Sequence, residues 1–338
     1  MVRNEQLIFN SVPKGVPVPG ETLKKVTTDI DIDNAPQNGF ISKTVVLSLD
    51  PYMRGRMRKP EGESYVDAFP LGKPLRNFGV SKVIKSNVAD FKQGDHVYSP
   101  AHEFAEYQSF SGDVLQTIQK LDNNKIKLPW STWVGAAGMP GMTAWWGVKN
   151  VIQPQKGERV FVSGAAGAVG QMVIALCHKA GAEVIASAGS DEKVNYLKNE
   201  LKVEHAFNYK TTNTKEFLQK TEFHAFWDNV GGETLEAVFE TIRPNGRIAE
   251  CGQISQYSLE SGDPIRNTFQ IVAKQLKVEG FIILHKNTDG FYDEVPPAIA
   301  SGELAAPKEH IYNGLDNGES FVDMLNGGNF GKAAISLE

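Results

Sequence analysis

The segment Val162–Gly181, which reads VSGAAGAVGQMVIALCHKAG, constrains the fold of this chain more than any other. An apolar strand ends at Ser163, and three glycines follow at Gly164, Gly167 and Gly170 before an amphipathic helix begins. In such a turn one glycine lets the backbone approach a bound group, and the last lets the helix pack on its strand. The free N–H groups and positive dipole of the helix N-terminus favour an anion. We therefore predict a dinucleotide-binding turn, with a purely structural turn as the alternative.

The chain after this turn alternates apolar strands with helical patterns. The predicted strands are Arg159–Ser163, Glu183–Ala186, Phe223–Asn229, Arg247–Cys251 and Val278–Leu284, and the predicted helices run through Ala180, over Asp191–Leu201 and over Glu233–Arg243. Strand–helix alternation of this kind implies a parallel sheet with helices on both faces.

The chain before Trp130 is β-rich instead. Its predicted strands are Gln6–Phe9, Lys43–Leu49, Gly79–Ile84, Asp95–Tyr98 and Phe104–Phe110. Clusters of Pro, Gly, Asn and Asp separate them. The chain ends in another strand-like segment, Lys332–Leu337, so we predict that the C-terminal tail returns to the first domain. The predicted architecture is a β-rich domain interrupted by an inserted α/β domain.

The second predicted strand of the α/β domain indicates which dinucleotide would bind. A site for NAD usually has an acidic residue about 20 residues after the first glycine, which binds the ribose 2′-hydroxyl. The corresponding window, Ile185–Ser190, holds no acid, and a carboxylate there would repel a 2′-phosphate. Lys193 and Asn208–Lys210 can supply charge and hydrogen bonds to a phosphate, although Lys193 alone would be interpreted as an exposed helix lysine. Together these features favour NADPH.

Composition narrows the classes of partner. The chain has 338 residues, enough for about two domains, with 35 Lys+Arg, 40 Asp+Glu and a net charge of −5. This mild acidity argues against nucleic acid and anionic membrane as main partners. No stretch approaches 18 consecutive apolar residues, and MVRNEQLIFN at the N-terminus is not typical of a signal peptide. We expect a cytoplasmic protein with no membrane partner.

Motifs for metals and nucleophiles are sparse. Two cysteines, Cys177 and Cys251, are too few for a disulfide framework or a four-cysteine zinc site. Cys177 lies in a predicted helix and Cys251 ends a predicted strand, so we interpret both as structural rather than nucleophilic. His102–Glu103 has neither a second histidine at helical spacing nor a nearby cysteine, so we predict no metal. Without a G-x-S-x-G elbow, a hydrolytic triad has no support.

Nine segments carry a family resemblance. They are LSLDPYMRGRM (Leu47–Met57), GMPGMTAWWG (Gly138–Gly147), GAAGAVG (Gly164–Gly170), AGSDEK (Ala188–Lys193), NYK (Asn208–Lys210), DNVGGE (Asp228–Glu233), CGQIS (Cys251–Ser255), VEGFII (Val278–Ile283) and GGNFGK (Gly327–Lys332). The whole chain resembles the zinc-independent medium-chain dehydrogenases/reductases, in the branch of leukotriene/prostaglandin reductases and 2-alkenal double-bond reductases. This resemblance implies a Rossmann doubly wound parallel sheet (residues 134–305, NADP-binding) inserted into a β-rich, GroES-like catalytic domain (residues 1–133 and 306–338).

The resemblance also implies a set of cofactor-binding residues. These are Gly167, Ala168, Val169 and Gly170 at the pyrophosphate; Gly189, Ser190, Lys193 and Tyr209 at the 2′-phosphate; Asn229 beside the adenosine and phosphates; Thr143, Cys251, Gly252, Ile254, Ser255, Tyr257 and the strand Phe281, Ile282, Ile283 beside the nicotinamide; and Asn329, which reaches the cofactor from the other domain.

The sequence differs from the pattern of the family at two positions that bear on substrate binding. Relatives often have a tyrosine, implicated in binding or protonating the substrate carbonyl, where this chain has Ala273. Assistance must then come from Tyr52, which matches a tyrosine at the substrate mouth, from Tyr257, from the nicotinamide ribose or from water. Either tyrosine can equally be a packed side chain with a solvated hydroxyl. Relatives also often have glycine at Asn77, and this difference would reshape the pocket wall.

The reaction that the resemblance implies is NADPH-dependent reduction of the C=C bond of an α,β-unsaturated aldehyde or ketone. A hydride passes to the β-carbon, negative charge develops on the carbonyl oxygen as an enolate, and a proton adds at the α-carbon. A quinone oxidoreductase and a non-catalytic NADPH-binding protein, which Ala273 would favour, are the alternatives. The resemblance further implies a homodimer, with Val278–Leu284 as the candidate edge.

Overall fold

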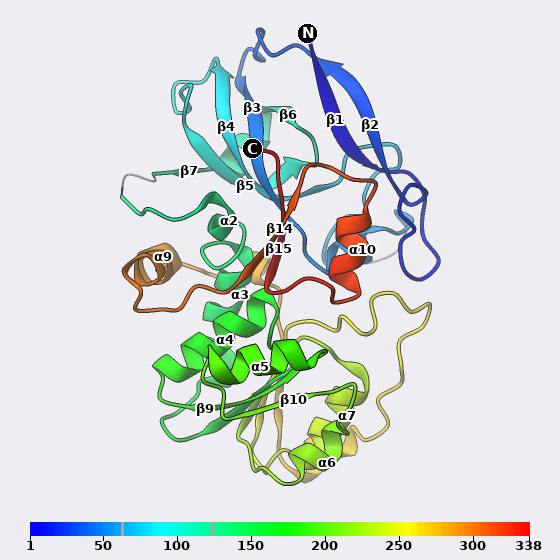
Figure 1. The fold of residues 1–338 in the computed structure, drawn as a ribbon, viewed down its shortest axis with the longest axis vertical. Coiled ribbons are helices and arrows are strands. Elements are labelled where there is room, and N and C mark those ends of the chain that lie inside the picture. Colours follow the sequence, from blue (N-terminus) through cyan, green and yellow to red (C-terminus); the bar gives the residue numbers. More distant parts are fainter. Residues whose placement is uncertain (62–63, 123–124) are drawn as a thin grey trace. The chain divides into compact units, whose positions relative to one another are not determined.

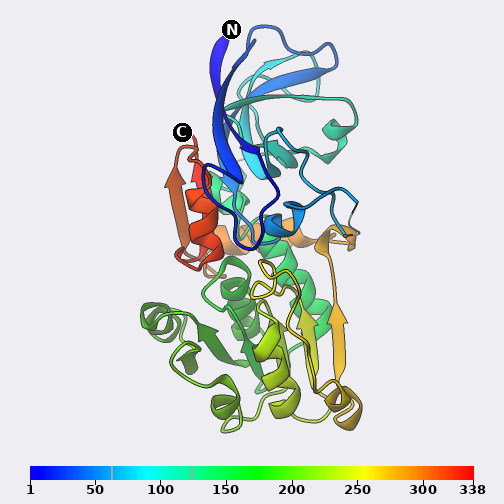
Figure 2. The same cartoon turned by 90° about the vertical axis from the view of Figure 1, so that its right-hand side faces the viewer.

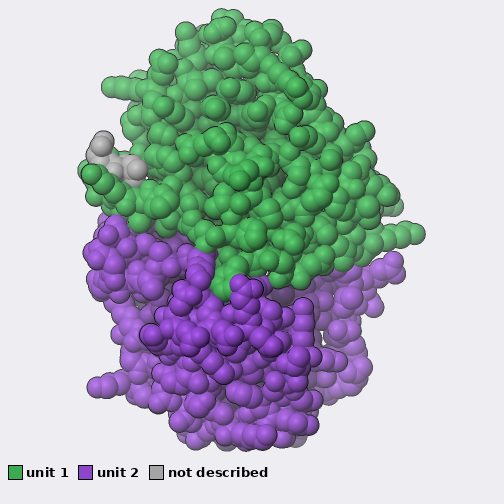
Figure 3. All heavy atoms as spheres, viewed as in Figure 1, with its two compact units in different colours: residues 1–135, 309–338 green, residues 136–308 purple. Residues whose placement is uncertain are grey.

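A computed structural model describes residues 1–61, 64–122 and 125–338, which form two compact units. Unit 1 comprises Met1–Gly135 and Glu309–Glu338, and unit 2 comprises Ala136–Lys308 (Figure 3). Unit 2 is therefore inserted into unit 1, where the sequence predicts an insertion over residues 134–305. Within the described ranges, no helix is both long enough and apolar enough to cross a membrane.

Residues 136–308, all of which are described, contain a parallel sheet of six strands (Figure 1). The strands are β8 (Arg159–Val162), β9 (Glu183–Ala188), β10 (His205–Asn208), β11 (Ala225–Asp228), β12 (Arg247–Glu250) and β13 (Lys277–Gly280). Their spatial order, β10-β9-β8-β11-β12-β13, is that of doubly wound dinucleotide-binding folds, in which ligands bind at the carboxyl ends where the order reverses. The predicted α/β class is confirmed, and the reversal lies between β8 and β11.

Helices cover both faces of this sheet. On one face lie α4 (Ala168–Lys179) and α5 (Asp191–Asn199), and on the other lie α6 (Thr214–Leu218) and α7 (Gly232–Thr241) (Figure 1). Helices α6 and α7 pack on aromatic side chains of the strands. Among these side chains, Phe161 stacks on Phe226 with ring centroids 5.0 Å apart. The remaining helical segments of unit 2 are α3 (Met139–Gly147), the π-helical turn η2 (Val148–Ile152), α8 (Phe269–Ala273), the 3-10 turn η3 (Ile283–His285) and α9 (Phe291–Ser301).

The described part of unit 1 contains a seven-stranded sheet and a separate two-stranded ribbon. The sheet has the order β14-β15-β3-β4-β5-β7, and β6 pairs with β3. Its strands are β3 (Gly39–Ser48), β4 (Arg76–Ser86), β5 (His96–Glu103), β6 (Tyr107–Ser111), β7 (Gln119–Leu121), β14 (Glu309–Asn313) and β15 (Lys332–Ser336), and the ribbon joins β1 (Val2–Phe9) to β2 (Leu23–Ile30). The short helices of unit 1 are α1 (Met53–Arg56), the 3-10 turn η1 (Gly112–Thr117), α2 (Trp130–Trp133) and α10 (Glu319–Leu325). Each strand predicted before Trp130 overlaps one of β1 and β3–β6.

Strand β15 joins the two sequence segments of unit 1. It pairs antiparallel with β3, with Ile335 opposite Leu47, and parallel with β14. Figure 2 shows the red C-terminal segment beside the blue N-terminal strands. Ala334 and Ile335 are completely buried there, so burial of apolar surface drives the return of the chain. The predicted return of the C-terminal tail is confirmed.

The strand predicted at Val278–Leu284 is wrong in its second half. β13 pairs with β12 only up to Gly280, which lies opposite Glu250, because the N–H groups of the next two residues, Cys251 and Gly252, turn to the Asp228 carbonyl of β11. Phe281 and Ile282 lie outside the sheet, and the chain then forms the 3-10 turn η3. The segment 281–283, which the resemblance describes as a strand, is therefore a strand exit followed by a turn.

Candidate functional site

The glycine-rich turn joins β8 to α4. Gly164 has a φ of +57°, and Gly167 is the N-cap of α4 and donates its N–H to the Gly164 carbonyl at 3.0 Å. A Cβ atom on Gly170 would lie 2.7 Å from the Cα of Ala165, so only glycine lets the helix approach the turn this closely. The N–H groups of residues 168–170 have no acceptor within the helix, which leaves them available to an anion.

Asn229 follows β11, the strand next to β8, and braces this turn. Its Nδ2 donates to the Ser163 carbonyl at 2.7 Å, and its Oδ1 accepts from Trp227 Nε1 at 3.1 Å. A Cβ atom on Gly164 would lie 3.4 Å from the Cβ of Asn229. The side-chain amide therefore holds the glycine-rich turn in place, a role that the sequence analysis did not predict.

The loop after β12 runs beside the residues that follow β11. The N–H groups of Cys251 and Gly252 both donate to the Asp228 carbonyl at 3.1 Å. Tyr257 folds back over the loop, and its hydroxyl oxygen accepts the N–H of Gln253 at 3.1 Å.

Ile254 and Ser255 continue this backbone pairing. Their N–H groups donate to the carbonyls of Asn229 and Val230 at 3.1 and 3.2 Å. The fold thus brings the predicted residues from Cys251 to Tyr257 together with Asn229 at the carboxyl end of the sheet.

Gly189, Ser190 and Tyr209 meet at the carboxyl ends of β9 and β10. A Cβ atom on Gly189 would lie 3.0 Å from the Tyr209 hydroxyl and 3.4 Å from the Cε of Lys210. Ser190 caps α5, and its Oγ accepts the N–H of Lys193 at 3.3 Å. A hydroxyl, a lysine and a helix N-terminus therefore surround Gly189, an arrangement that fits an anionic group.

Two acids, Asp191 and Glu192, follow Ser190 directly, outside the window that the sequence analysis considered. The Asp191 carboxylate accepts from Asn208 Nδ2 at 2.9 Å, so it is tied to the end of β10. Both side chains are exposed in the first turn of α5, where negative charge stabilises the helix dipole.

The residues predicted beside the nicotinamide from α3 and the segment after β13 are mostly buried. Phe281 packs between Trp146 and Trp227, with ring centroids 5.0 and 5.8 Å away, so its side chain belongs to the core. The Thr143 hydroxyl donates to the Met139 carbonyl at 2.8 Å. Of the segment 281–283, only residue 282 is partly exposed.

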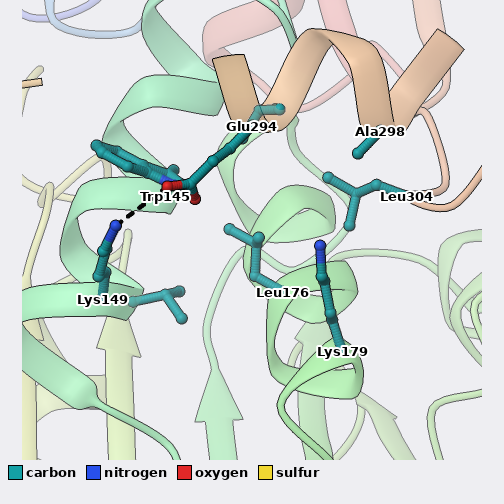
Figure 4. Close-up of a pocket in the computed structure, with 9 residues that line it drawn as sticks. Trp145, Lys149, Leu176, Lys179, Glu294, Ala298 and Leu304 are labelled. Carbon is teal, nitrogen blue, oxygen red and sulfur yellow. Dashed lines mark hydrogen bonds and ion pairs between the residues drawn. The ribbon is translucent and has the colours of Figure 1, made fainter. Parts of the chain in front are cut away.

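Unit 2 also contains a separate pocket of about 180 Å³ (Figure 4). Its lining residues, all in the described part of the chain, are Trp145, Val148, Lys149, Leu176, Lys179, Glu294, Val295, Ala298 and Leu304. Trp145 Nε1 donates to Glu294 Oε2 at 2.8 Å, and Lys149 Nζ lies 3.3 Å from Glu294 Oε1. None of the predicted site residues is part of this lining.

Unit 1 holds Tyr52 and Asn329. Tyr52 is half-buried just before α1, and its hydroxyl donates to Asn77 Oδ1 at 2.6 Å. Asn77, where relatives often have glycine, is completely buried and thus contacts the predicted catalytic tyrosine directly. Asn329 lies before β15, and its Nδ2 donates to the Gly331 carbonyl at 2.7 Å, so its amide is tied into its own turn.

His102 is a buried structural residue. Its Nδ1 lies 3.0 Å from the Ser99 carbonyl and must donate to it, so Nε2 accepts from the Ser81 hydroxyl at 2.9 Å. Burial lowers the pKa of His102 to about 4, so the ring is neutral near pH 7. Across the described ranges, no group of three or more His, Cys, Asp or Glu side chains is placed to hold a metal ion.

A pair of carboxyl groups lies at the ends of β11 and β12, where Asp228 is opposite Glu250. Asp228 Oδ1 accepts from the N–H groups of Val230 and Gly231 and from the Ser163 hydroxyl, at 2.8, 3.0 and 2.8 Å. Burial raises the pKa of both acids, and the negative charge of Asp228 further raises that of Glu250, to about 7. Because three donors favour the ionised form of Asp228, we assign the negative charge to Asp228 and the proton to Glu250.

The same pair acts on the neighbouring thiol. Burial, with the charges of Asp228 and Glu250, raises the pKa of Cys251 to about 12, and burial raises that of Cys177 to about 12. Both thiols are neutral near pH 7, in agreement with a structural interpretation. No sequence pattern indicates this carboxyl pair, because only the register of β11 on β12 brings the two acids together.

The carboxyl ends of β8–β12 fit a phosphorylated dinucleotide. The close approach at Gly170 keeps the N-terminus of α4 beside the turn, where a pyrophosphate can accept its N–H groups. The surroundings of Gly189, with the Tyr209 hydroxyl, the Lys210 side chain and the start of α5, fit a further phosphate. These two candidate anion sites lie at the ends of two neighbouring strands, β8 and β9.

Two families of known proteins match the chain. A family described as zinc-binding dehydrogenase matches residues 168–300, and one described as N-terminal domain of oxidoreductase matches residues 5–118. A 2-alkenal reductase (NADP(+)-dependent) from Nicotiana tabacum is 37% identical over 99% of this chain and 98% of its own length. A (+)-pulegone reductase from Mentha piperita is 34% identical over 100% of this chain and 99% of its own length. The crystal structure of CurA in complex with NADPH from Vibrio vulnificus is 31% identical, with a TM-score of 0.88 and 99% of each chain covered.

The Asp228–Glu250 pair makes a prediction for stability. Glu250 binds its proton more tightly in the folded chain than in the unfolded chain, so unfolding releases this proton between about pH 4.5 and 7. Its contribution to the free energy of unfolding is therefore present at pH 4.5 and lost as the pH rises through 7. Glu250→Gln should remove this loss, which amounts to about 1–3 kcal/mol. Urea unfolding of both proteins at pH 5.0 and 7.5 measures the difference.

Histidines with lowered pKa values, such as His102, change stability with pH in the opposite direction. Because wild type and Glu250→Gln share these histidines, the difference between the two proteins reports on Glu250 alone. Glu260→Gln removes an exposed carboxylate from the same loop region and is the matched control. If Glu250→Gln and wild type lose stability equally between the two pH values, the assignment of the proton to Glu250 is wrong.

Proposed function

This chain belongs to the zinc-independent, double-bond reductase branch of the medium-chain dehydrogenase/reductase family, and we propose that it reduces the C=C bond of α,β-unsaturated aldehydes and ketones with NADPH. The observation that carries the proposal is the full-length similarity to the 2-alkenal reductase, at 37% identity. The similarity to the NADPH complex of CurA supports the choice of cofactor.

NADPH supplies the hydride for this reduction when it is bound. We propose that residues 167–170 bind its pyrophosphate through N–H groups at the start of α4. Gly189, Ser190, Lys193 and Tyr209 would hold the 2′-phosphate, since the Tyr209 hydroxyl and the start of α5 meet there. The proposed contribution of the chain is therefore to bind, orient and discriminate the cofactor.

Two tyrosine side chains are candidates for contact with the substrate. Negative charge on the carbonyl oxygen of the substrate is stabilised by a hydrogen-bond donor aimed at it. Tyr257, on the loop after β12, is the candidate donor in unit 2, and Tyr52 is the candidate substrate contact in unit 1.

Ala273 ends α8, and the adjacent Lys274 carbonyl accepts the N–H of Asn245, which precedes β12. Position 273 therefore lies near the amino ends of the strands.

A substrate panel tests the reaction class. We expect 2-alkenals and enones to oxidise NADPH and to yield saturated carbonyl compounds, with quinones turned over more slowly. Rates with NADPH should exceed those with NADH by about tenfold or more, because each charge-assisted hydrogen bond to the 2′-phosphate contributes about 1.5–3 kcal/mol. Faster turnover of quinones would favour a quinone oxidoreductase. Tight NADPH binding without turnover of any compound would favour a non-catalytic protein.

Lys193→Ala tests the cofactor assignment separately. We expect the KM for NADPH to rise by about tenfold or more, from the loss of one charge-assisted hydrogen bond to phosphate, with little change for NADH. Steady-state kinetics with both cofactors provides the measurement. Lys198→Ala, on the exposed side of the same helix, is the matched control and should change neither KM. Equal effects of Lys193→Ala on both cofactors would reject the 2′-phosphate role.

We also propose that the protein is a homodimer joined at β13. This strand is the edge of the unit 2 sheet, and all four of its residues are exposed. Nearby apolar side chains are exposed as well, with Phe269 at 73% and Val272 at 70% on α8. An unpaired strand edge flanked by exposed apolar residues is suited to pairing with a second copy.

Charged substitutions test the dimer. Val272→Asp combined with Val278→Asp should convert the dimer to a monomer, because each carboxylate would be placed in an apolar interface. Light scattering measures the mass. Ile311→Asp, on the edge strand β14 of unit 1, is the control and should leave the mass of wild type unchanged. A monomeric wild type would contradict the proposal.

A further inference from the structure

A buried polar network lies beside Tyr52 in unit 1. Its other members are Asn77, Ser48, Asp50 and Lys332, whose exposure lies between 0 and 4%. Burying an ion pair such as Asp50–Lys332 removes both charges from water, and apolar residues of similar size often stabilise a protein as well or better. The network is therefore poorly explained by stability alone, and its geometry bears on the Tyr52 hydroxyl.

The side-chain amide of Asn77 has only one possible orientation. Its Nδ2 lies 2.9 Å from the Ser48 carbonyl oxygen and 2.8 Å from Asp50 Oδ2. Both are acceptors, so the reversed amide would place its oxygen against two oxygens. Asn77 Oδ1 therefore faces the Tyr52 hydroxyl, 2.6 Å away, and only Tyr52 can donate in that bond.

The ion pair holds Asp50 in the orientation that Asn77 requires. Lys332 Nζ donates to Asp50 Oδ1 at 2.9 Å and to the Leu49 carbonyl at 2.7 Å. The Ser48 hydroxyl donates to Asp50 Oδ2 alongside Asn77. From Lys332 through Asp50 and Asn77 to Tyr52, the hydrogen bonds thus form one connected network.

This arrangement uses the only proton of the Tyr52 hydroxyl. A phenol donates one hydrogen bond and otherwise accepts. Burial and the negative charge of Asp50 raise the pKa of Tyr52, so the phenol retains its proton.

We propose that Asn77 is a positioning residue that holds the Tyr52 hydroxyl proton, so that Tyr52 presents an aromatic ring and a hydrogen-bond acceptor to the substrate and does not protonate it. Asp50 and Lys332 act through Asn77. This inference rests on the proposed reduction of enals and enones, and it limits Tyr52 to orienting the substrate. The donor to the carbonyl oxygen and the proton for the α-carbon then come from other groups.

The kinetics of Tyr52→Phe test this division of roles. An enal without a hydroxyl group has no proton to donate to an acceptor, so Tyr52→Phe should leave its KM almost unchanged. For an enal that carries a hydroxyl group, which can donate to the Tyr52 oxygen, the KM should rise by about two- to tenfold, the equivalent of one neutral hydrogen bond. We expect kcat to change by less than about twofold and the pH profile of kcat to stay unchanged, since a donor of the proton would instead contribute about 10²–10⁴-fold. A fall in kcat of that size, with a changed pH profile, would overturn the proposal.

A double-mutant cycle tests whether Asn77 acts through Tyr52. Asn77→Leu should raise the KM for the hydroxyl-bearing enal as Tyr52→Phe does, because the Tyr52 hydroxyl is no longer held as an acceptor, but it should have almost no further effect in the Tyr52→Phe background. Gln108→Leu is the control, because Gln108 is another buried side-chain amide of unit 1 and accepts the N–H of Glu103 at 2.8 Å. Its effect should be the same in both backgrounds. Equal effects of Asn77→Leu with and without Tyr52→Phe would contradict the proposal.

An NMR measurement needs neither turnover nor substrate. The chain has nine tyrosines, and with ¹³Cζ-labelled tyrosine the resonance missing in Tyr52→Phe belongs to Tyr52. Asn77→Leu should shift that resonance, because the phenol loses its acceptor, while Gln108→Leu should leave it in place. If wild type reduces no enal or enone, the proposed function fails while this measurement still tests the bond. An unshifted Tyr52 resonance in folded Asn77→Leu would overturn the proposal itself.

Discussion

The buried ion pair between Lys332 and Asp50 closes unit 1. The two residues are 282 positions apart, one at the start of β15 and the other just after β3, so the pair joins segments that the whole of unit 2 separates. Burial lowers the pKa of Lys332, and the negative charge of Asp50 opposes that change. Loss of either partner would leave an uncompensated buried charge, a change that typically costs about 3–5 kcal/mol. The interrupted unit and the setting of Tyr52 therefore depend on the same contact.

Unit 2 depends on a steric constraint instead. The absence of a side chain at Gly170 lets α4 begin directly beside the glycine-rich turn, and the Asn229 amide holds that turn from the next strand. Parallel strands then bring the loops after β8, β9, β11 and β12 to one edge of the sheet. Each unit thus has its own means of placing functional groups: close backbone approach in unit 2, and a network of directed hydrogen bonds in unit 1.

Sequence reasoning succeeded where the signal is local. The alternation of strands and helices predicted the parallel sheet, since apolar periodicity and turn residues report on neighbours in sequence. It failed at Phe281, which belongs to an aromatic cluster with Trp146 and Trp227 rather than to a strand. The length of β13 is set by where β12 ends, and no residue of β13 carries that information.

The sequence by itself determined the α/β insertion, the glycine-rich turn and the absence of an acid at residues 185–190, because each depends on residue type at short spacing. Only the tertiary structure decided which polar groups meet. Asp228 faces Glu250 through the register of two strands, and Tyr52 donates to Asn77, 25 residues away, through the packing of unit 1. Hydrogen bonds act over about 3 Å, so the partner of a polar side chain is settled only when the backbone brings the two atoms to that distance.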